Sequence, residues 1–147
     1  MLSKSIALER EHDIAVARNE VRLVAAQLGF RLTDQTRLAT VTSELARNII
    51  KYALRGRVIV NELRRHGTGA PGLRLIFEDD GPGIPAGQRE ELFTRGKRLD
   101  TTGKPGTGLG LAIVKHVVEH HHGSLNIASE LGIGTVVTVL LPTITEP

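Results

Sequence analysis

The sequence predicts a two-layer α/β sandwich, in which about three helices cover one face of a mixed, mainly antiparallel sheet. The order of the expected elements indicates this class: a strand, two helices, two strands, a helix and two strands. Length and composition agree, because 147 residues suit a single domain spanning 1–147, and 40% hydrophobic with 24% charged residues is ordinary globular composition. Aromatic residues make up only 3%, so we expect an aliphatic core.

The first part of the chain predicts an edge strand and two helices. Residues 5–9 suit the strand, and apolar residues recur at helical spacing over 11–28, where Gly29 ends the helix. Asp34 is the expected N-cap of a second helix that runs to about Ala53. One face of that helix is apolar and is predicted to be buried: Leu38, Val41, Leu45, Ile49 and Tyr52.

The second part of the chain predicts four strands and a third helix. The strands are expected at 57–63, 73–78, 125–129 and 135–141, separated by turns rich in glycine. A basic, polar stretch follows the second of them and contains a short helical piece at 88–93. The third helix opens at the glycine-rich run 106–110 and continues to about His122, where Gly123 ends it.

Composition narrows the function classes. The sequence has no cysteine, which excludes disulfides, thiol catalysis and cysteine-based zinc sites. The net charge of +3 is spread along the chain and aromatic residues are scarce, so a nucleic-acid partner is not indicated. We find neither a signal peptide nor a membrane-spanning apolar run, and we expect a cytoplasmic protein without a membrane partner.

Glu44, Asn48 and Lys51 share one face of the second predicted helix, at positions i, i+4 and i+7. Asn48 can offer an oxygen ligand to magnesium, and Lys51 can offer charge to a phosphate. Glu44 could accept a proton from an attacking hydroxyl group. A solvated helix face is the simpler interpretation of these three residues taken alone.

Asp79-Asp-Gly-Pro-Gly83 follows an apolar strand. A carboxylate in this place can accept a hydrogen bond from the amino group of a base, and the glycines allow backbone to approach a flat ring. A plain tight turn would use the same residue types. Thr135, which follows Gly134 at the start of the last strand, could support Asp79 through its hydroxyl group or a water, or could simply be a good β-former.

Gly106-Thr-Gly-Leu-Gly110 precedes the third helix. Glycines at a helix N-terminus expose backbone N–H groups at its positive end, which suits a phosphate. The block is not a Walker A motif, because no Gly-Lys-Ser/Thr follows. It is also a poor dinucleotide fingerprint, because a polar loop rather than a strand precedes it.

Four blocks have now been described, namely Glu44 to Lys51, Asp79 to Gly83, Gly106 to Gly110 and Gly134-Thr135. Together they resemble the GHKL (Bergerat-fold) ATPase and kinase superfamily, which includes gyrase, MutL and the histidine kinases. Their order and spacing match its N, G1 and G2 boxes and closing strand, over nearly the whole chain. The resemblance implies ATP and Mg²⁺ as cofactors, Asn48 as metal ligand, Asp79 at the adenine amino group and Thr135 as its relay. It also implies a lid over about 86–105. The nucleotide-binding residues implied by the resemblance are Asn48, Lys51, Asp79, Gly81, Gly83, Ile84, Lys97, Lys104, Gly106, Thr107, Gly108, Leu109, Gly110, Leu111 and Thr135.

Within the superfamily, the first fifty residues look like the small anti-sigma and stressosome switch kinases, whereas the lid and G2 box look like those of a histidine kinase. Glu44 stands where histidine kinases usually carry Asn, and a base is expected where a hydroxyl attacks the γ-phosphate. Only about forty residues precede Glu44, so we expect no complete histidine kinase. The implied activity is a serine/threonine protein kinase with Glu44 as its catalytic base.

Three alternatives for function and partners stay open. The resemblance implies a STAS-domain antagonist protein as substrate, and it also allows a sigma factor, a phosphatase or a homodimer as partner. The chain could instead be a partner-switching binding module that uses nucleotide as a state signal, or a stand-alone histidine-kinase-type catalytic domain.

His116 and His120–His122 are interpreted as charges that complement a helix C-terminus. Arg18, Arg22 and Arg47 are interpreted as surface charges, with Arg47 close to the expected pocket.

Overall fold

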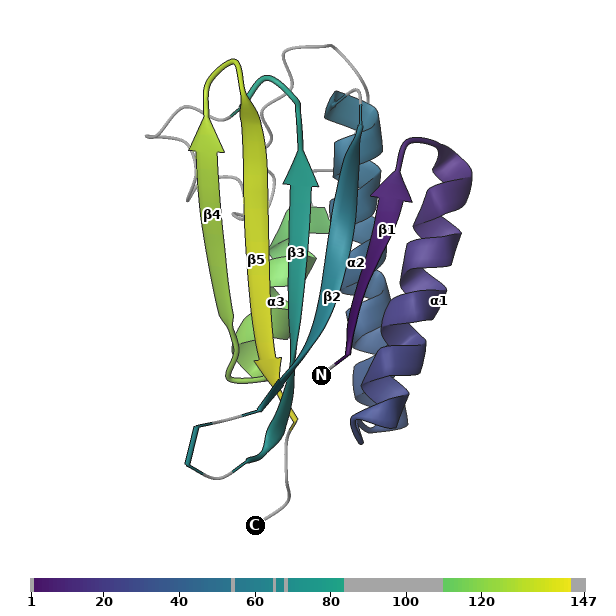
Figure 1. The fold of residues 1–147 in the computed structure, drawn as a ribbon, viewed down its shortest axis with the longest axis vertical. Coiled ribbons are helices and arrows are strands. Elements are labelled where there is room, and N and C mark those ends of the chain that lie inside the picture. The colour runs from purple at the N-terminus through teal and green to yellow at the C-terminus, as the bar shows by residue number, and fades with distance from the viewer. Residues whose placement is uncertain (1, 54, 65, 68, 84–109, 144–147) are drawn as a thin grey trace.

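The structure, a computed structural model, describes residues 2–53, 55–64, 66–67, 69–83 and 110–143. Three helices lie against one face of a five-stranded sheet, as the sequence predicts (Figure 1). The elements in chain order are β1 (Ser3–Leu8), α1 (Glu11–Gln27), α2 (Leu32–Tyr52), β2 (Gly56–Arg64), β3 (Pro71–Asp79), α3 (Gly110–His120), β4 (Ser124–Glu130) and β5 (Gly134–Pro142). The predicted helical piece at 88–93 lies outside the described residues.

The sheet has the strand order β1-β2-β3-β5-β4, and each described pair of neighbours is antiparallel. β1 forms an edge, as expected, while β3 lies at the centre between β2 and β5. The sheet therefore places the end of β3 beside the start of β5, where Asp79 and Thr135 are register partners. This juxtaposition is the structural basis of the candidate site.

The core lies between the sheet and the helices and is almost entirely aliphatic. The apolar face predicted for α2 is confirmed at Leu38, Val41, Leu45 and Ile49, which are buried, while the side chain of Tyr52 lies outside the described part of the structure. Strands β2, β3 and β5 contribute alternate residues to the same cluster, as a sheet with one covered face requires. Phe77 is the largest fully buried side chain of the described residues.

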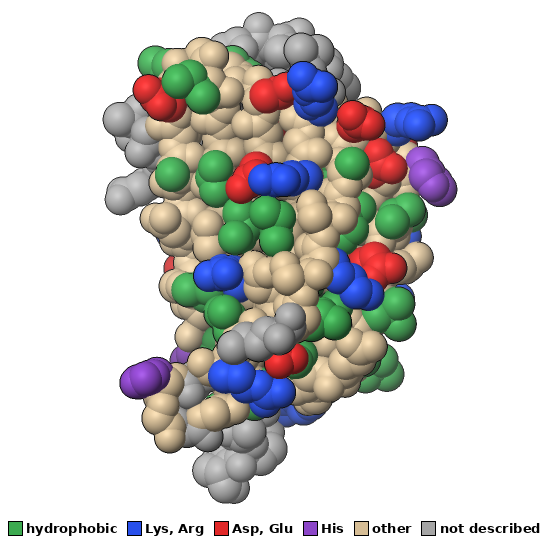
Figure 2. Space-filling view, in the orientation of Figure 1, with side chains coloured by type: hydrophobic (Ala, Val, Ile, Leu, Met, Phe, Trp, Pro, Cys, Tyr) green, Lys and Arg blue, Asp and Glu red, His purple; other side chains and the backbone are tan. Residues whose placement is uncertain are grey.

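The other face of the sheet is covered by none of the described helices. Figure 2 shows that it mixes hydrophobic and charged side chains. Two cross-strand pairs between β2 and β3 tie it together: Arg57 Nε lies 2.7 Å from Glu78 Oε2, and Arg74 Nε donates to Asn61 Oδ1 at 3.2 Å. These pairs satisfy polar groups on a half-solvated sheet face.

The observed helices lie within one or two residues of the predicted ends, but the start of α2 differs in its capping residue. Gly29 ends the α1 segment in a left-handed conformation, with φ of 93°, as expected. Asp34, however, does not cap α2, because the helix begins at Leu32 with Arg31 as its N-cap residue. The prediction was wrong because Asp34, in the first turn, is buried and is used for a tertiary contact instead of a local cap.

Candidate functional site

Asp79 is the last residue of β3, and its carboxylate is held by backbone donors. The N–H of Gly81 donates to Asp79 Oδ1 at 2.8 Å, and the N–H of Thr135 also donates to this carboxylate. Burial raises the pKa of Asp79 above its ordinary value, and the neighbouring charge of Asp80 adds to this, although the two backbone hydrogen bonds oppose it. The structure thus holds a partly desolvated hydrogen-bond acceptor at a strand end.

Thr135 supports this carboxylate through its backbone, whereas its hydroxyl group contacts Ser129. The two hydroxyl oxygens are 2.9 Å apart, and Ser129 Oγ also donates to the carbonyl oxygen of Gly134 at 3.1 Å. Gly134 has a φ of 153°, and a Cβ placed on it would collide with the carbonyl oxygen of Asp79. Glycine is therefore required where β5 approaches the end of β3. The sequence pattern did not indicate the contribution of Ser129.

The loop after Asp79 is built around Gly83. Gly83 has a φ of 80°, and a Cβ there would collide with the carbonyl oxygen of Glu130. Gly132 N donates to the carbonyl oxygen of Pro82 at 2.9 Å, so the β4–β5 turn is hydrogen-bonded to this loop. Glycine is therefore required at position 83 because the loop packs against the β4–β5 turn, whereas its approach to a base stays a prediction.

The C-terminal part of α2 lies beside the end of the sheet at which β3 ends. Gly56, the first residue of β2, lies between Ile49 and Asp79, because a Cβ on it would meet Ile49 Cγ2 and the Cα of Asp79. Asp80 is tied to Arg55, which follows α2: Arg55 N donates to Asp80 Oδ1 at 3.1 Å. The last turns of α2 are therefore anchored beside the end of β3.

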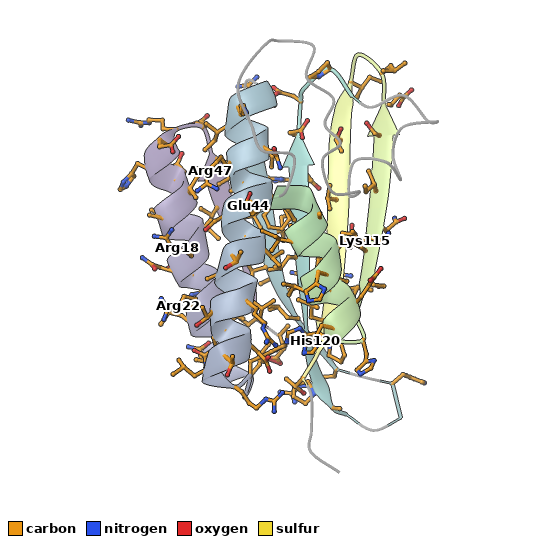
Figure 3. The ribbon with its side chains drawn as sticks, turned by 180° about the vertical axis from the view of Figure 1, so that it is seen from behind. Arg18, Arg22, Glu44, Arg47, Lys115 and His120 are labelled. Carbon is orange, nitrogen blue, oxygen red and sulfur yellow. The ribbon has the colours of Figure 1, made fainter. Side chains whose placement is uncertain are left out.

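Glu44, Asn48 and Lys51 all lie on α2 and are all partly exposed. Glu44 forms an ion pair that the sequence did not predict, with Arg47 Nη1 3.2 Å from Glu44 Oε1 (Figure 3). The Glu44 side chain is 27% exposed and that of Arg47 is 48% exposed. A carboxylate with one oxygen engaged by Arg47 retains a second oxygen that can accept a proton.

Part of the predicted site lies outside the described residues: Ile84, Lys97, Lys104, Gly106, Thr107, Gly108 and Leu109. The lid predicted for 86–105 falls there as well. Gly110 and Leu111 are the first two residues of α3. The N-terminal end of α3 faces the edge of the sheet where β3 ends (Figure 1).

His121 and Asp34 form a buried pair far from this edge. His121 Nε2 and Asp34 Oδ1 are 2.8 Å apart, although they lack the alignment of a hydrogen bond, and His121 Nδ1 lies 3.0 Å from the carbonyl oxygen of Val117. His121 is fully buried and Asp34 is 2% exposed. The sequence did not indicate that His121 is buried: its Nδ1 lies against a carbonyl oxygen of the last turn of α3, as the helix C-terminus interpretation expects, but its Nε2 faces the first turn of α2.

The chain shares this arrangement with known proteins. A family model described as histidine kinase-, DNA gyrase B- and HSP90-like ATPase matches residues 33–145. The chain belongs to this ATPase family. The resemblance inferred from the four sequence blocks is thereby confirmed.

Among curated relatives, the serine/threonine-protein kinase RsbT of Bacillus subtilis is 39% identical over 137 residues, which cover 92% of each chain. The sensor-like histidine kinase SenX3 of Mycobacterium tuberculosis is 37% identical over 118 residues, 78% of this chain. The chain spans only about 28% of the length of SenX3. Relatives of both kinase types therefore match this chain. Of these two relatives, RsbT matches over almost its whole length and SenX3 does not.

Solved structures agree on the fold. The mycobacterial sensor histidine kinase MprB superposes with a TM-score of 0.64 at 26% identity, covering 97% of this chain and all of that one. The histidine kinase-type sandwich predicted from the sequence is therefore confirmed. No described helix has the length and apolar character needed to cross a membrane.

The described residues fit an adenine nucleotide. Asp79 offers a partly desolvated acceptor at the end of β3, and the loop that follows it contains Gly83. Asn48 offers an oxygen atom of the kind that Mg²⁺ prefers, on the helix anchored next to Asp79. Within the described part of the chain, no group of three or more histidine, aspartate or glutamate side chains could hold a metal ion by itself. A magnesium ion here would be shared with phosphate oxygens, as is usual for this ion.

Proposed function

We propose that this protein is a Mg-ATP-dependent serine/threonine protein kinase that phosphorylates a STAS-type antagonist protein in bacterial sigma-factor or stress signalling. The observation that carries the proposal is Glu44, a partly exposed carboxylate one turn before Asn48 on α2. Similarity to RsbT over 92% of both chains supports the same conclusion.

The chemistry needs a base. Glu44 would accept the proton of the substrate's hydroxyl group while that oxygen forms its bond to the γ-phosphorus, and ADP would leave with the electrons of the broken P–O bond. Asn48 would hold the magnesium ion, whose charge stabilises the phosphates. Lys51 would add positive charge, and Asp79 with Gly83 would hold the adenine.

Transfer of radiolabelled γ-phosphate to a STAS-domain protein tests this function. We expect phosphate that survives acid, which is the behaviour of phosphoserine and phosphothreonine. Glu44→Gln should lower the transfer rate by about 100-fold or more, because a positioned general base contributes on that order, while the affinity for ATP stays unchanged.

Glu119→Gln is the matched control, because Glu119 is an exposed glutamate of α3 outside the candidate site. It should keep the wild-type rate. If Glu44→Gln also transfers phosphate at the wild-type rate, Glu44 is not the base. Because Glu44→Gln alters one side chain of an exposed helix surface, its thermal stability should match that of the wild type.

A second candidate function is that of a histidine-kinase-type catalytic domain that serves a separate phosphotransfer protein. The similarity to SenX3 over 78% of this chain favours it. The same transfer assay separates the two functions. Acid-labile phosphate on a histidine-containing protein, with no acid-stable product, would support this second candidate.

A further inference from the structure

We propose that the outer face of α1 and α2 is a docking surface for an acidic patch on a partner protein. Arg18 and Arg22 of α1 and Arg47 of α2 form it, and we call it the arginine face. The inference rests on the proposed function for one point, namely that the partner is the protein substrate. Figure 3 shows Arg18 and Arg22 along α1, beside Arg47 and Glu44 on α2.

Arg18 and Arg22 are cations without partners in the part of the chain that the structure describes. They stand four residues apart and so share one face of α1. Arg22 is exposed and Arg18 is half-buried, and neither forms an ion pair or side-chain hydrogen bond with a described residue. Two adjacent unpaired arginines repel each other, so an incoming carboxylate is favoured there.

The acidic residues of the same helices are mostly engaged elsewhere. Asp13 accepts backbone N–H groups before α1, Glu20 pairs with Lys4 of β1 at 2.8 Å, and Asp34 is buried. Glu11, in the first turn of α1, is exposed and is the remaining acidic residue of that helix. The positive charge of the arginine face is thus left without local neutralisation, apart from the pair that Arg47 makes with Glu44.

That pair links the arginine face to the proposed chemistry. Arg47 and Glu44 form an exposed ion pair three residues apart, and such pairs contribute little to stability. A carboxylate of the partner can therefore take Arg47 at small cost, and both oxygens of Glu44 then become free to accept a proton. Docking of an acidic partner would place its hydroxyl group near Glu44 and release this base in the same step.

A protein fits this surface better than a nucleic acid. Arginine is enriched and lysine is depleted in protein interfaces, and all three cations here are arginines. Glu44 lies among them and would repel a phosphate backbone, whereas a protein surface can place a hydroxyl group against it. Aromatic residues, which stack on single-stranded bases, make up only 3% of the chain.

Direct binding is the first test. A fluorescein-labelled oligoglutamate peptide is titrated by anisotropy with wild-type protein at low salt, in the presence of ADP and magnesium so that the candidate phosphate pocket is filled. We expect Arg18→Glu/Arg22→Glu to weaken binding by about tenfold or more. The control Arg64→Glu/Lys115→Glu makes the same change of net charge at two exposed positions outside the arginine face. It should bind like the wild type.

The kinase assay is the second test, with the STAS-domain protein as substrate. Arg18→Glu/Arg22→Glu should raise the KM for that protein while leaving kcat and the KM for ATP unchanged. Arg18→Gln/Arg22→Gln should show a smaller rise in the same KM, and it serves if the reversal impairs folding. High salt should raise the KM of the wild type more than that of either variant.

The outcomes separate the two proposals. If no STAS-domain protein is phosphorylated, the proposed function fails, and the peptide titration still decides the docking surface. If phosphorylation occurs and the reversals leave the KM for the protein unchanged, the docking surface is overturned and the kinase stands. Equal loss of peptide binding in the control, no binding by the wild type, or tighter arginine-dependent binding of duplex DNA than of peptide would each overturn the docking surface.

Discussion

Asp79 is the residue at which function and stability oppose each other. Its carboxylate accepts two backbone hydrogen bonds, yet burial still raises its pKa. Because the folded-state pKa lies above the unfolded one, the stability that this group contributes is fully present below the unfolded value of 3.8 and is lost as pH rises through the folded value. At neutral pH the ionised carboxylate therefore opposes folding of the nucleotide-free protein.

Asp79→Asn should consequently raise the melting temperature at neutral pH while abolishing detectable ATP binding. The amide oxygen can still accept the backbone hydrogen bonds, but the amide cannot provide the charged acceptor for the adenine amino group. Thermal denaturation over a pH series, with equilibrium ATP binding, measures both effects. The gain in stability should disappear in acid.

Asp80→Asn is the control for this prediction. Asp80 is exposed, and hydrogen bonds from Arg55 lower its pKa, so removing its charge should bring no gain. A variant Asp79→Asn that binds ATP like the wild type would contradict the adenine role of this residue. One that is less stable than the wild type at neutral pH would contradict the burial argument.

At the scale of elements, the contact between α2 and α3 includes a polar pair in an otherwise aliphatic core. Asp34 enters from the first turn of α2, and His121 follows the last residue of α3. Arg31 Nε adds a bond of 3.2 Å to the other oxygen of Asp34. Arg37 Nη1 lies 3.7 Å from Asp34 Oδ1, so Asp34 keeps two arginine partners when His121 is removed, and the main loss is the buried ring itself.

His121→Ala should lower the free energy of unfolding by roughly 2–5 kcal/mol, because it removes a fully buried ring and leaves a cavity in its place. Its neighbour His120 is exposed, so His120→Ala should change stability by less than about 0.5 kcal/mol. Urea denaturation of the two variants measures the difference. Similar midpoints for both would show that the pair carries no special stability.

The pH dependence of this pair has a definite sign. Burial by itself raises the pKa of Asp34, but the contact with His121 and the hydrogen bond from Arg31 outweigh burial and lower it below 3.8. The carboxylate therefore contributes stability above that value and loses it as pH falls through the lowered folded-state pKa. The stability difference between the wild type and Asp34→Asn should shrink in strong acid.

For the whole molecule, the candidate pocket joins elements from both halves of the chain. Its residues come from α2, from the end of β3 and from the start of β5, and the N-terminal end of α3 points towards the same end of the sheet. A ligand held by all of these elements binds the folded chain and not the unfolded chain, so it stabilises the folded state by mass action.

A non-hydrolysable ATP analogue with magnesium should accordingly raise the melting temperature. At a ligand concentration of about 100 times Kd, the expected gain is about 2.7 kcal/mol. Chelation of magnesium by EDTA should reduce the shift, because Asn48 alone cannot compensate the phosphate charge. Differential scanning fluorimetry measures it. A shift that persists unchanged in Asp79→Asn would place the nucleotide elsewhere.

The sequence by itself determined the order of elements, the apolar face of α2 and the sandwich, because hydrophobic periodicity reports which face of each element is buried. It also located Gly83 and Gly134, since only glycine tolerates those backbone conformations and close approaches. Local rules sufficed to locate these features because each residue type has a distinctive local preference, although the contacts of Gly83 with Glu130 and of Gly134 with Asp79 are tertiary.

Tertiary structure alone decided the strand order β1-β2-β3-β5-β4, the ion pair of Glu44 with Arg47, and the burial of His121 against Asp34. Local rules assigned Asp34 to a cap and His121 to a helix dipole, because each residue type favours those places. Their actual partners lie 87 positions apart in the chain. A polar contact over such a separation leaves no periodic signal, so only the packing of α2 against α3 could create it.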